Sequence, residues 1–203
     1  MMNTVVVKTF SQPQFSNSEI LRYAGAKAPY GEISALIEQC KEEAEGLLSY
    51  KACYIILDLN ITGSVCDFTL FKVASKSLAS ALSGCKKAVI FAASIGIGLD
   101  RLILKYSNMA QTRALLLDAI GNERVEALCN TLCAEIEKET GFALTKRFSA
   151  GYGDLPVDTQ RDIFALLDCP RKIGVTLNNS LLMSPSKSVT AFVGLKEKEQ
   201  FSL

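Results

Sequence analysis

The residues best suited to chemistry lie at positions 147–156, which read Arg-Phe-Ser-Ala-Gly-Tyr-Gly-Asp-Leu-Pro. The guanidinium of Arg147 offers paired donors that fit a carboxylate, and the two glycines allow a positive φ or close approach of the backbone to a ligand. Tyr152, between them, adds an aromatic face with a polar tip. This combination could hold a ligand with a carboxylate and a flat ring. A plainer interpretation is a strand-to-helix turn with an exposed arginine, since Pro156 suits the first turn of a helix.

Other reactive groups are few. The chain has no histidine, which excludes Ser-His and Cys-His nucleophiles and an imidazole ligand for a metal. The seven cysteines are odd in number and mostly lie in apolar runs, which favours reduced, buried thiols in a cytoplasmic protein. Cys129 and Cys133 would share a helix face, but without a second pair they do not indicate zinc. No catalytic residue and no metal site are therefore predicted.

A second glycine-rich stretch, residues 96–101, reads Gly-Ile-Gly-Leu-Asp-Arg after an apolar run. It resembles a dinucleotide fingerprint, but Arg101 stands where the third glycine belongs, and no acidic residue follows at the expected distance. A strand-to-helix turn bordering the ligand cleft is the favoured interpretation. An unrelated enzyme with a weak nucleotide site at this turn remains an alternative.

Hydrophobic periodicity predicts an α+β fold with a mixed or antiparallel twisted sheet covered by helices. Residues 87–94 are apolar on both faces and should form a central strand. A capping box at Ser16 predicts a helix start, Gly141 a helix end, and Gly121 a possible break in the longest helix. Helices are expected at 16–23, 29–50, 72–82, 99–107, 109–140 and 157–167, and strands at 4–10, 51–59, 65–70, 87–94, 142–150, 174–177 and 188–195.

Length and composition suit one domain over residues 1–203, with an N-terminal strand and helices (1–50), a core (51–195) and a frayed tail (196–203). The chain is 49% apolar, and its net charge of +1 argues against a broad nucleic-acid surface. The N-terminus does not read as a signal peptide, and no apolar run approaches the roughly 18 residues that a membrane span needs. Neither nucleic acid nor a membrane is an expected partner.

The segment from Arg147 to Gly194 resembles the activation domain of vitamin B12-dependent methionine synthase. Arg147, Gly151, Tyr152 and Pro156 have the spacing of that family's Arg-x-x-x-Gly-Tyr-x-x-x-Pro motif. A looser match extends back to the helix around Glu126. The family's later motifs follow in order, as Ile173-Gly174-Val175-Thr176-Leu177, Ser180-Leu181-Leu182-Met183-Ser184-Pro185 and Ser188-Val189.

The resemblance implies that the chain binds S-adenosylmethionine and presents its methyl group to a cobalamin. It implies that Arg147 holds the ligand's carboxylate, that Ala150, Gly151 and Tyr152 supply backbone and aromatic contacts, and that Glu126 receives its ammonium. A solvent-facing helix charge is the alternative for Glu126. Met183 and Ser188 lie in a matching motif, but a turn and a strand that close the core are favoured over direct ligand contact.

The chain departs from the family pattern at Ala150, at Gly153-Asp154 and at Ser184. It also has no Asp-x-His-x-x-Gly motif, so the cobalamin would have to be carried by a separate protein. The leading hypothesis is a stand-alone reactivation subunit serving a cobalamin-binding methionine synthase that lacks this domain, with a flavodoxin-like electron donor. Such a chain would be a component of a methyltransferase rather than an independent enzyme. The alternative is a non-catalytic module that binds a metabolite or a corrinoid protein for another methyltransferase.

Overall fold

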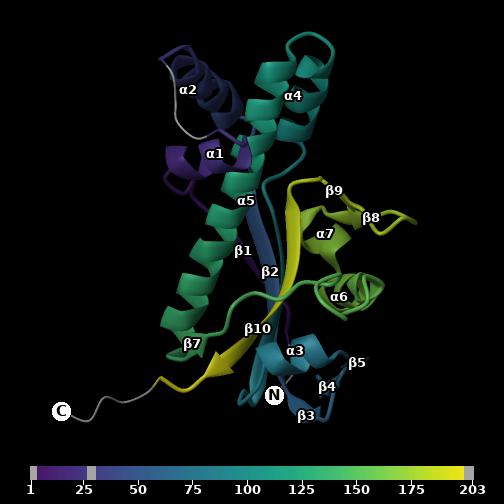
Figure 1. Ribbon diagram of the computed structural model, residues 1–203. Helices are drawn as coiled ribbons and strands as arrows, with labels where there is room; N and C mark the ends of the chain where they lie inside the picture. Colours follow the sequence, from purple (N-terminus) through teal and green to yellow (C-terminus); the bar gives the residue numbers. More distant parts are fainter. Residues whose placement is uncertain (1–3, 27–30, 199–203) are drawn as a thin grey trace, which may run out of the picture.

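A five-stranded antiparallel sheet forms the centre of the computed structural model, which describes residues 4–26 and 31–198. The sheet is twisted, and helices cover both of its faces, so the predicted α+β class is confirmed (Figure 1). Neighbouring strands in the sheet are β1 (Val6–Phe10), β2 (Tyr50–Asp58), β6 (Lys87–Ser94), β10 (Ser188–Lys196) and β7 (Ala143–Leu144).

Strand β6 is the middle strand, as its uninterrupted apolar sequence predicted. It pairs with β2 on one side and β10 on the other, and all of its residues except Lys87 are buried. Successive side chains of a strand point to opposite faces. Val89, Phe91 and Ala93 therefore enter one hydrophobic cluster, while Ala88, Ile90 and Ala92 enter another on the opposite face.

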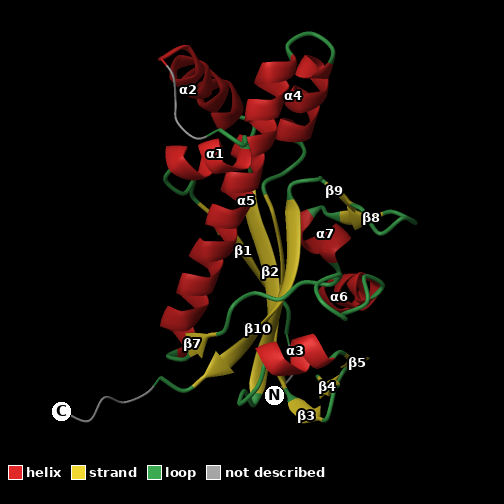
Figure 2. Cartoon of the chain, in the orientation of Figure 1, coloured by secondary structure: helices red, strands yellow, loops and turns green. Residues whose placement is uncertain are grey.

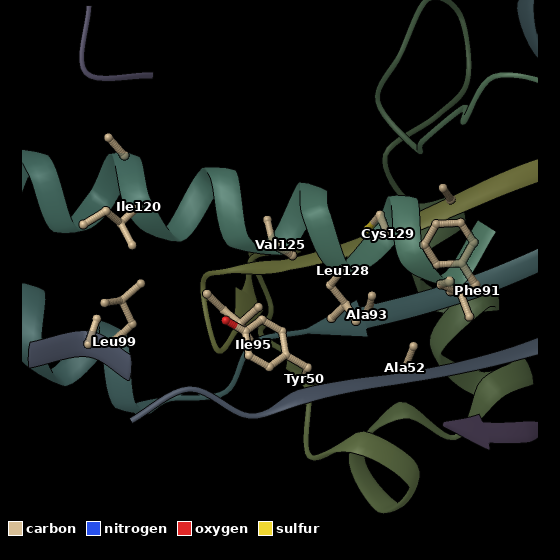
Figure 3. Packing of buried hydrophobic residues seen from close by; sticks show 14 of the residues in the cluster. Tyr50, Ala52, Phe91, Ala93, Ile95, Leu99, Ile120, Val125, Leu128 and Cys129 are labelled. Carbon is tan, nitrogen blue, oxygen red and sulfur yellow. The ribbon is translucent and has the colours of Figure 1, made fainter. Parts of the chain in front are cut away.

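The first face is covered by α1 (Asn17–Tyr23), α2 (Gly31–Glu45), α4 (Gly98–Ser107) and the long α5 (Gln111–Thr140). Leu128 and Cys129 of α5 lie over Phe91 and Ala93 of the sheet (Figure 3). Ser16 caps α1 by accepting from the Glu19 amide at 3.4 Å, as the capping box predicted. Residues 29–30 of the predicted 29–50 helix lie outside the described residues, and α2 ends at Glu45.

The opposite face is covered by three short helices and a small second sheet (Figure 2). These elements frame the second cluster around Phe68 and Phe192, whose ring centroids are 5.3 Å apart. They are α3 (Lys76–Ala81), α6 (Thr159–Leu167), α7 (Cys169–Ile173), β3 (Asn60–Thr62), β4 (Val65–Asp67) and β5 (Lys72–Ala74). A hairpin of β8 (Thr176–Leu177) and β9 (Met183–Ser184) then leads into β10.

Several predicted elements differ from the structure, among them the strand expected over 65–70, which ends at Asp67 as β4. The helix expected over residues 72–82 is wrong at its start, because β5 pairs with β4 and Ser75 then caps α3. The strand expected over 142–150 shrinks to β7 and an isolated bridge between Phe148 and Phe192. Helix α5 runs unbroken through Gly121, where a Cβ would lie 2.7 Å from Leu99 Cδ2. That glycine lets α4 approach α5 closely.

The glycines at 96 and 98 are explained by packing. Gly96 has φ +83°, and a Cβ on Gly98 would lie 2.3 Å from the Leu47 carbonyl oxygen. Gly98 begins α4, so the helix starts directly against the backbone that leads into β2. This close approach accounts for the second glycine without a phosphate-binding loop.

All seven cysteines are free thiols, and all but Cys133 are buried. We predict that neither a reductant nor a chelator lowers the melting temperature by more than about 1 °C, because no disulfide closes a loop in the unfolded chain. Differential scanning fluorimetry with dithiothreitol or EDTA measures this, with untreated protein as the control. A fall of several degrees with either reagent would contradict the prediction. In residues 4–26 and 31–198, no cluster of three or more potential metal ligands occurs, and no helix is long and apolar enough to cross a membrane.

Candidate ligand-binding site

A cavity of about 730 Å³ lies beside α5, where the chain leaves β7 and where β10 begins. Its volume falls within the range of pockets that hold small ligands. Its lining combines charged, hydroxyl and apolar groups from four separate parts of the chain. The lining residues are Glu126, Asn130, Cys133, Ala134, Glu137, Leu144, Thr145, Lys146, Arg147, Ser149, Ala150, Tyr152, Gln160, Met183, Ser188, Val189 and Thr190.

Helix α5 supplies one wall. Its five lining residues are spaced three, four or one apart, from Glu126 to Glu137, which places them along one side of the helix. The other side of α5 is buried against the sheet through Leu128, Leu132 and Ile136. Packing of the apolar side thus fixes how the polar side faces the cavity.

Arg147 is held against this wall. It donates from Nη1 to Asn130 Oδ1 at 2.7 Å and from Nη2 to Glu126 Oε2 at 2.5 Å. Its backbone is fixed too, because the next residue, Phe148, exchanges two hydrogen bonds with Phe192 of β10. A guanidinium has five N–H donors, so these two bonds leave donors for a further acceptor. The site therefore presents a cation and an anion in contact, one quarter and about two fifths exposed.

The turn after Arg147 closes a second side of the cavity. Gly151, at φ +88°, donates its amide to the Leu155 carbonyl at 3.0 Å, and the Leu155 amide donates to the Tyr152 carbonyl at 3.0 Å. Ser149 anchors the start of the turn by donating to the Thr190 carbonyl of β10 at 2.8 Å. Tyr152 stands out from this turn and is 59% exposed. Its ring lies edge-on to the ring of Phe148, with 6.1 Å between the two ring centroids. The positive φ explains why a glycine precedes the tyrosine.

Four of the five residues predicted from the sequence line this one cavity: Glu126, Arg147, Ala150 and Tyr152. Gly151 is the turn residue between the last two. Met183 and Ser188, from the later motif, line it as well. Their roles toward a ligand stay predictions. The structure adds a feature that the sequence prediction did not contain, which is that Glu126 and Arg147 pair with each other.

Sequence reasoning missed several polar residues of the lining, among them Asn130 and Gln160. Asn130 lies one helical turn after Glu126, so the i, i+4 spacing on the long helix could have identified it. Gln160 lies in the first turn of α6 and carried no such signal. It is 9% exposed, and its Oε1 is buried without a hydrogen-bond partner in the described part of the chain. Leaving an acceptor unpaired is costly, so Gln160 would gain from a donor that enters the cavity.

The site is suited to binding more than to nucleophilic chemistry. Burial raises the pKa of the Cys133 thiol, which lines the cavity, and that of Cys129 behind it. A neutral thiol is a poor nucleophile. The charged pair of Arg147 and Glu126 can instead receive the two ends of a zwitterion, such as the carboxylate and ammonium of an amino acid.

Comparison with known proteins gives two findings. Residues 75–202 match the family described as "Vitamin B12 dependent methionine synthase, activation domain". The fold is similar to a solved structure titled "Crystal Structure of the MetH Reactivation Domain bound to AdoHcy", with a TM-score of 0.69 and 15% sequence identity, over 98% of this chain and 81% of that chain. A search of curated proteins finds no match.

Proposed function

This chain belongs to the activation-domain family of vitamin B12-dependent methionine synthase, and we propose that it acts as a stand-alone reactivation subunit. In this proposal it binds S-adenosylmethionine and serves a cobalamin carried by a separate methionine synthase that lacks an activation domain. The observation that carries the proposal is the Arg147–Glu126 pair at the wall of the cavity. The similar solved domain, which was crystallised with AdoHcy, supports a ligand of this class.

The proposed binding mode is an exchange of ion pairs. The ligand's carboxylate takes the guanidinium of Arg147, and its ammonium takes the carboxylate of Glu126. Asn130 keeps the guanidinium in place during the exchange because its bond to Nη1 is separate from the bond to Glu126. Tyr152 offers its exposed ring to the adenine, and Ala150 and Gly151 supply the backbone beneath it.

Positioning is the chemical task that falls to this chain. A sulfonium methyl is already activated, so its transfer requires in-line presentation and no acid or base from the protein. Without histidine, this chain offers no imidazole to a cobalt ion. A reduced cobalamin on the partner protein would supply the nucleophile, and a flavodoxin-like donor would supply its electron. We place this activity in the cytoplasm, since seven free thiols suit a reducing compartment.

Two measurements test the proposal. Calorimetric titration should show saturable binding of S-adenosylmethionine and of S-adenosylhomocysteine. The protein, added with S-adenosylmethionine and a reductant, should then restore turnover to an oxidised methionine synthase from which the activation domain has been removed. Binding without rescue would favour a metabolite- or corrinoid-protein-binding module for another methyltransferase. Absence of binding, with the partner also present, would overturn the proposed function.

A further inference from the structure

Asp154 connects the turn at the cavity with a distant part of the chain. Its carboxylate accepts three hydrogen bonds: from Ser75 Oγ at 2.5 Å, from the Lys76 amide at 2.8 Å and from the Ser77 amide at 3.0 Å. The two amides belong to the unpaired first turn of α3, where a negative charge is favourable. These bonds, that from Ser75 first, hold the pKa of the Asp154 carboxyl well below its usual range, so it is a carboxylate.

The residue before it makes the contact tight. Gly153 has φ +55°, and a Cβ at this position would lie 2.5 Å from Ser77 Oγ and 2.8 Å from Ser77 Cβ. Any larger residue would therefore push the turn away from α3 or strain its backbone. Gly153 and Asp154 together fix the turn to the start of α3, which is about 77 residues earlier in the chain.

The other end of the same turn carries Tyr152, which lines the cavity. Because Tyr152 is 59% exposed, its ring has little packing beyond the edge contact with Phe148. The place of its ring therefore depends on where the backbone of the turn is held. Before Tyr152, that backbone is held by the hydrogen bond of Ser149 to β10. After Tyr152, it is held by the hydrogen bonds of Asp154 to the start of α3.

We propose that Asp154 is a positioning residue for the ligand, which acts by docking the Tyr152 turn onto α3. The proposal rests on the proposed function, since S-adenosylmethionine is the ligand whose adenine Tyr152 would contact. It also gives a role to α3 and the small β3–β5 sheet behind it, which become the support of one side of the ligand site. Ser75 links Asp154 to α3, because its hydroxyl donates to Asp154 and accepts from the Leu78 amide of α3 at 3.0 Å.

A double-mutant cycle tests this proposal by calorimetric titration with S-adenosylmethionine. Asp154→Ala should weaken binding by about three- to thirtyfold, which lies within the range that coupled neighbouring residues show. Asp154→Asn should recover only part of this loss. Its one oxygen can still accept from Ser75 Oγ and the Ser77 amide, but its NH2 group would face the Lys76 amide, which is also a donor. In a Tyr152→Ala background, which itself binds weakly, Asp154→Ala should cause no further loss. Loss of general stability would not produce that pattern.

Several results would overturn the proposal. One is equal affinity of wild type and Asp154→Ala. Another is the same fold-loss from Asp154→Ala with and without Tyr152, since the residue would then not act through the tyrosine. Should Asp154→Ala fail to fold, Asp154→Asn, which loses the bond from the Lys76 amide, takes its place in the cycle. If the wild type binds no S-adenosylmethionine, the proposed function is wrong, and this proposal is wrong with it. If the wild type binds, the variants test the role of Asp154 alone.

Discussion

Arg147→Ala should weaken S-adenosylmethionine binding by about 1.5–3 kcal/mol, the range for a hydrogen bond to a charged group. That range corresponds to roughly a tenfold to 150-fold rise in Kd. The planar fork of the guanidinium matches a carboxylate with two parallel donors, and its loss leaves the ligand's carboxylate without them. Glu126 would also face the cavity without its cation, which opposes a second negative charge nearby.

The stability of the fold should change little in this variant. The Arg147 side chain is 25% exposed and Glu126 is 38% exposed, so their pair is partly solvated. Pairs of this kind contribute about 0–1 kcal/mol. A lower affinity with an unchanged melting temperature would therefore locate the effect at the ligand site.

Two variants make the experiment specific. Arg147→Lys keeps the charge without the fork, and should recover only part of the affinity. Arg161→Ala removes an exposed arginine of α6 that pairs with Asp158 and does not line the cavity, so it should bind like wild type. Calorimetric titration of all four proteins gives the comparison. Equal affinity of wild type and Arg147→Ala would move the carboxylate site elsewhere.

The central part of the fold was predictable because its signals are local. The apolar run at β6 permits only a strand buried on both faces, and Ser16 and Gly141 have the chemistry of helix caps. The start of α3 was not predictable in this way. Residues 72–74 join a strand only because β4 pairs with them, and tertiary pairing of that kind overrides local preference.

The site shows the same division. The family motif identified Arg147 and Tyr152, and the looser resemblance on the long helix identified Glu126. Sequence alone could not show that Arg147 and Glu126 contact each other at 2.5 Å, since 21 residues separate them. The role of Asp154 was hidden for the same reason, because its partners lie on α3. In the motif it appeared only as a departure from the family pattern.

A buried ion pair on α5 is the least expected feature of the core. Arg124 is 0% exposed and Glu123 is 4% exposed, and the guanidinium donates to both carboxylate oxygens at 2.5 Å. Arg124 also donates to the carbonyls of Pro13 and Gln14, at 2.5 and 2.8 Å, and lies 3.9 Å from the centre of the Phe15 ring. Glu123 in turn accepts from the Ser16 amide at 3.2 Å. The pair thus fastens the segment before α1 onto α5.

Arg124→Met should lower the free energy of unfolding by about 3–5 kcal/mol, the cost of removing one partner from a buried pair. The remaining Glu123 carboxylate would be buried with one amide donor, and the carbonyls of Pro13 and Gln14 would lose theirs. The double variant Glu123→Gln/Arg124→Met should recover part of the loss because it removes the isolated charge. Arg113→Met is the matched control on the same helix, since its pair with Glu43 is about one quarter exposed, and it should cost about 1 kcal/mol or less. Urea denaturation followed by circular dichroism measures all four proteins, and equal losses for Arg124→Met and Arg113→Met would show that the buried pair is not what fastens the N-terminal segment.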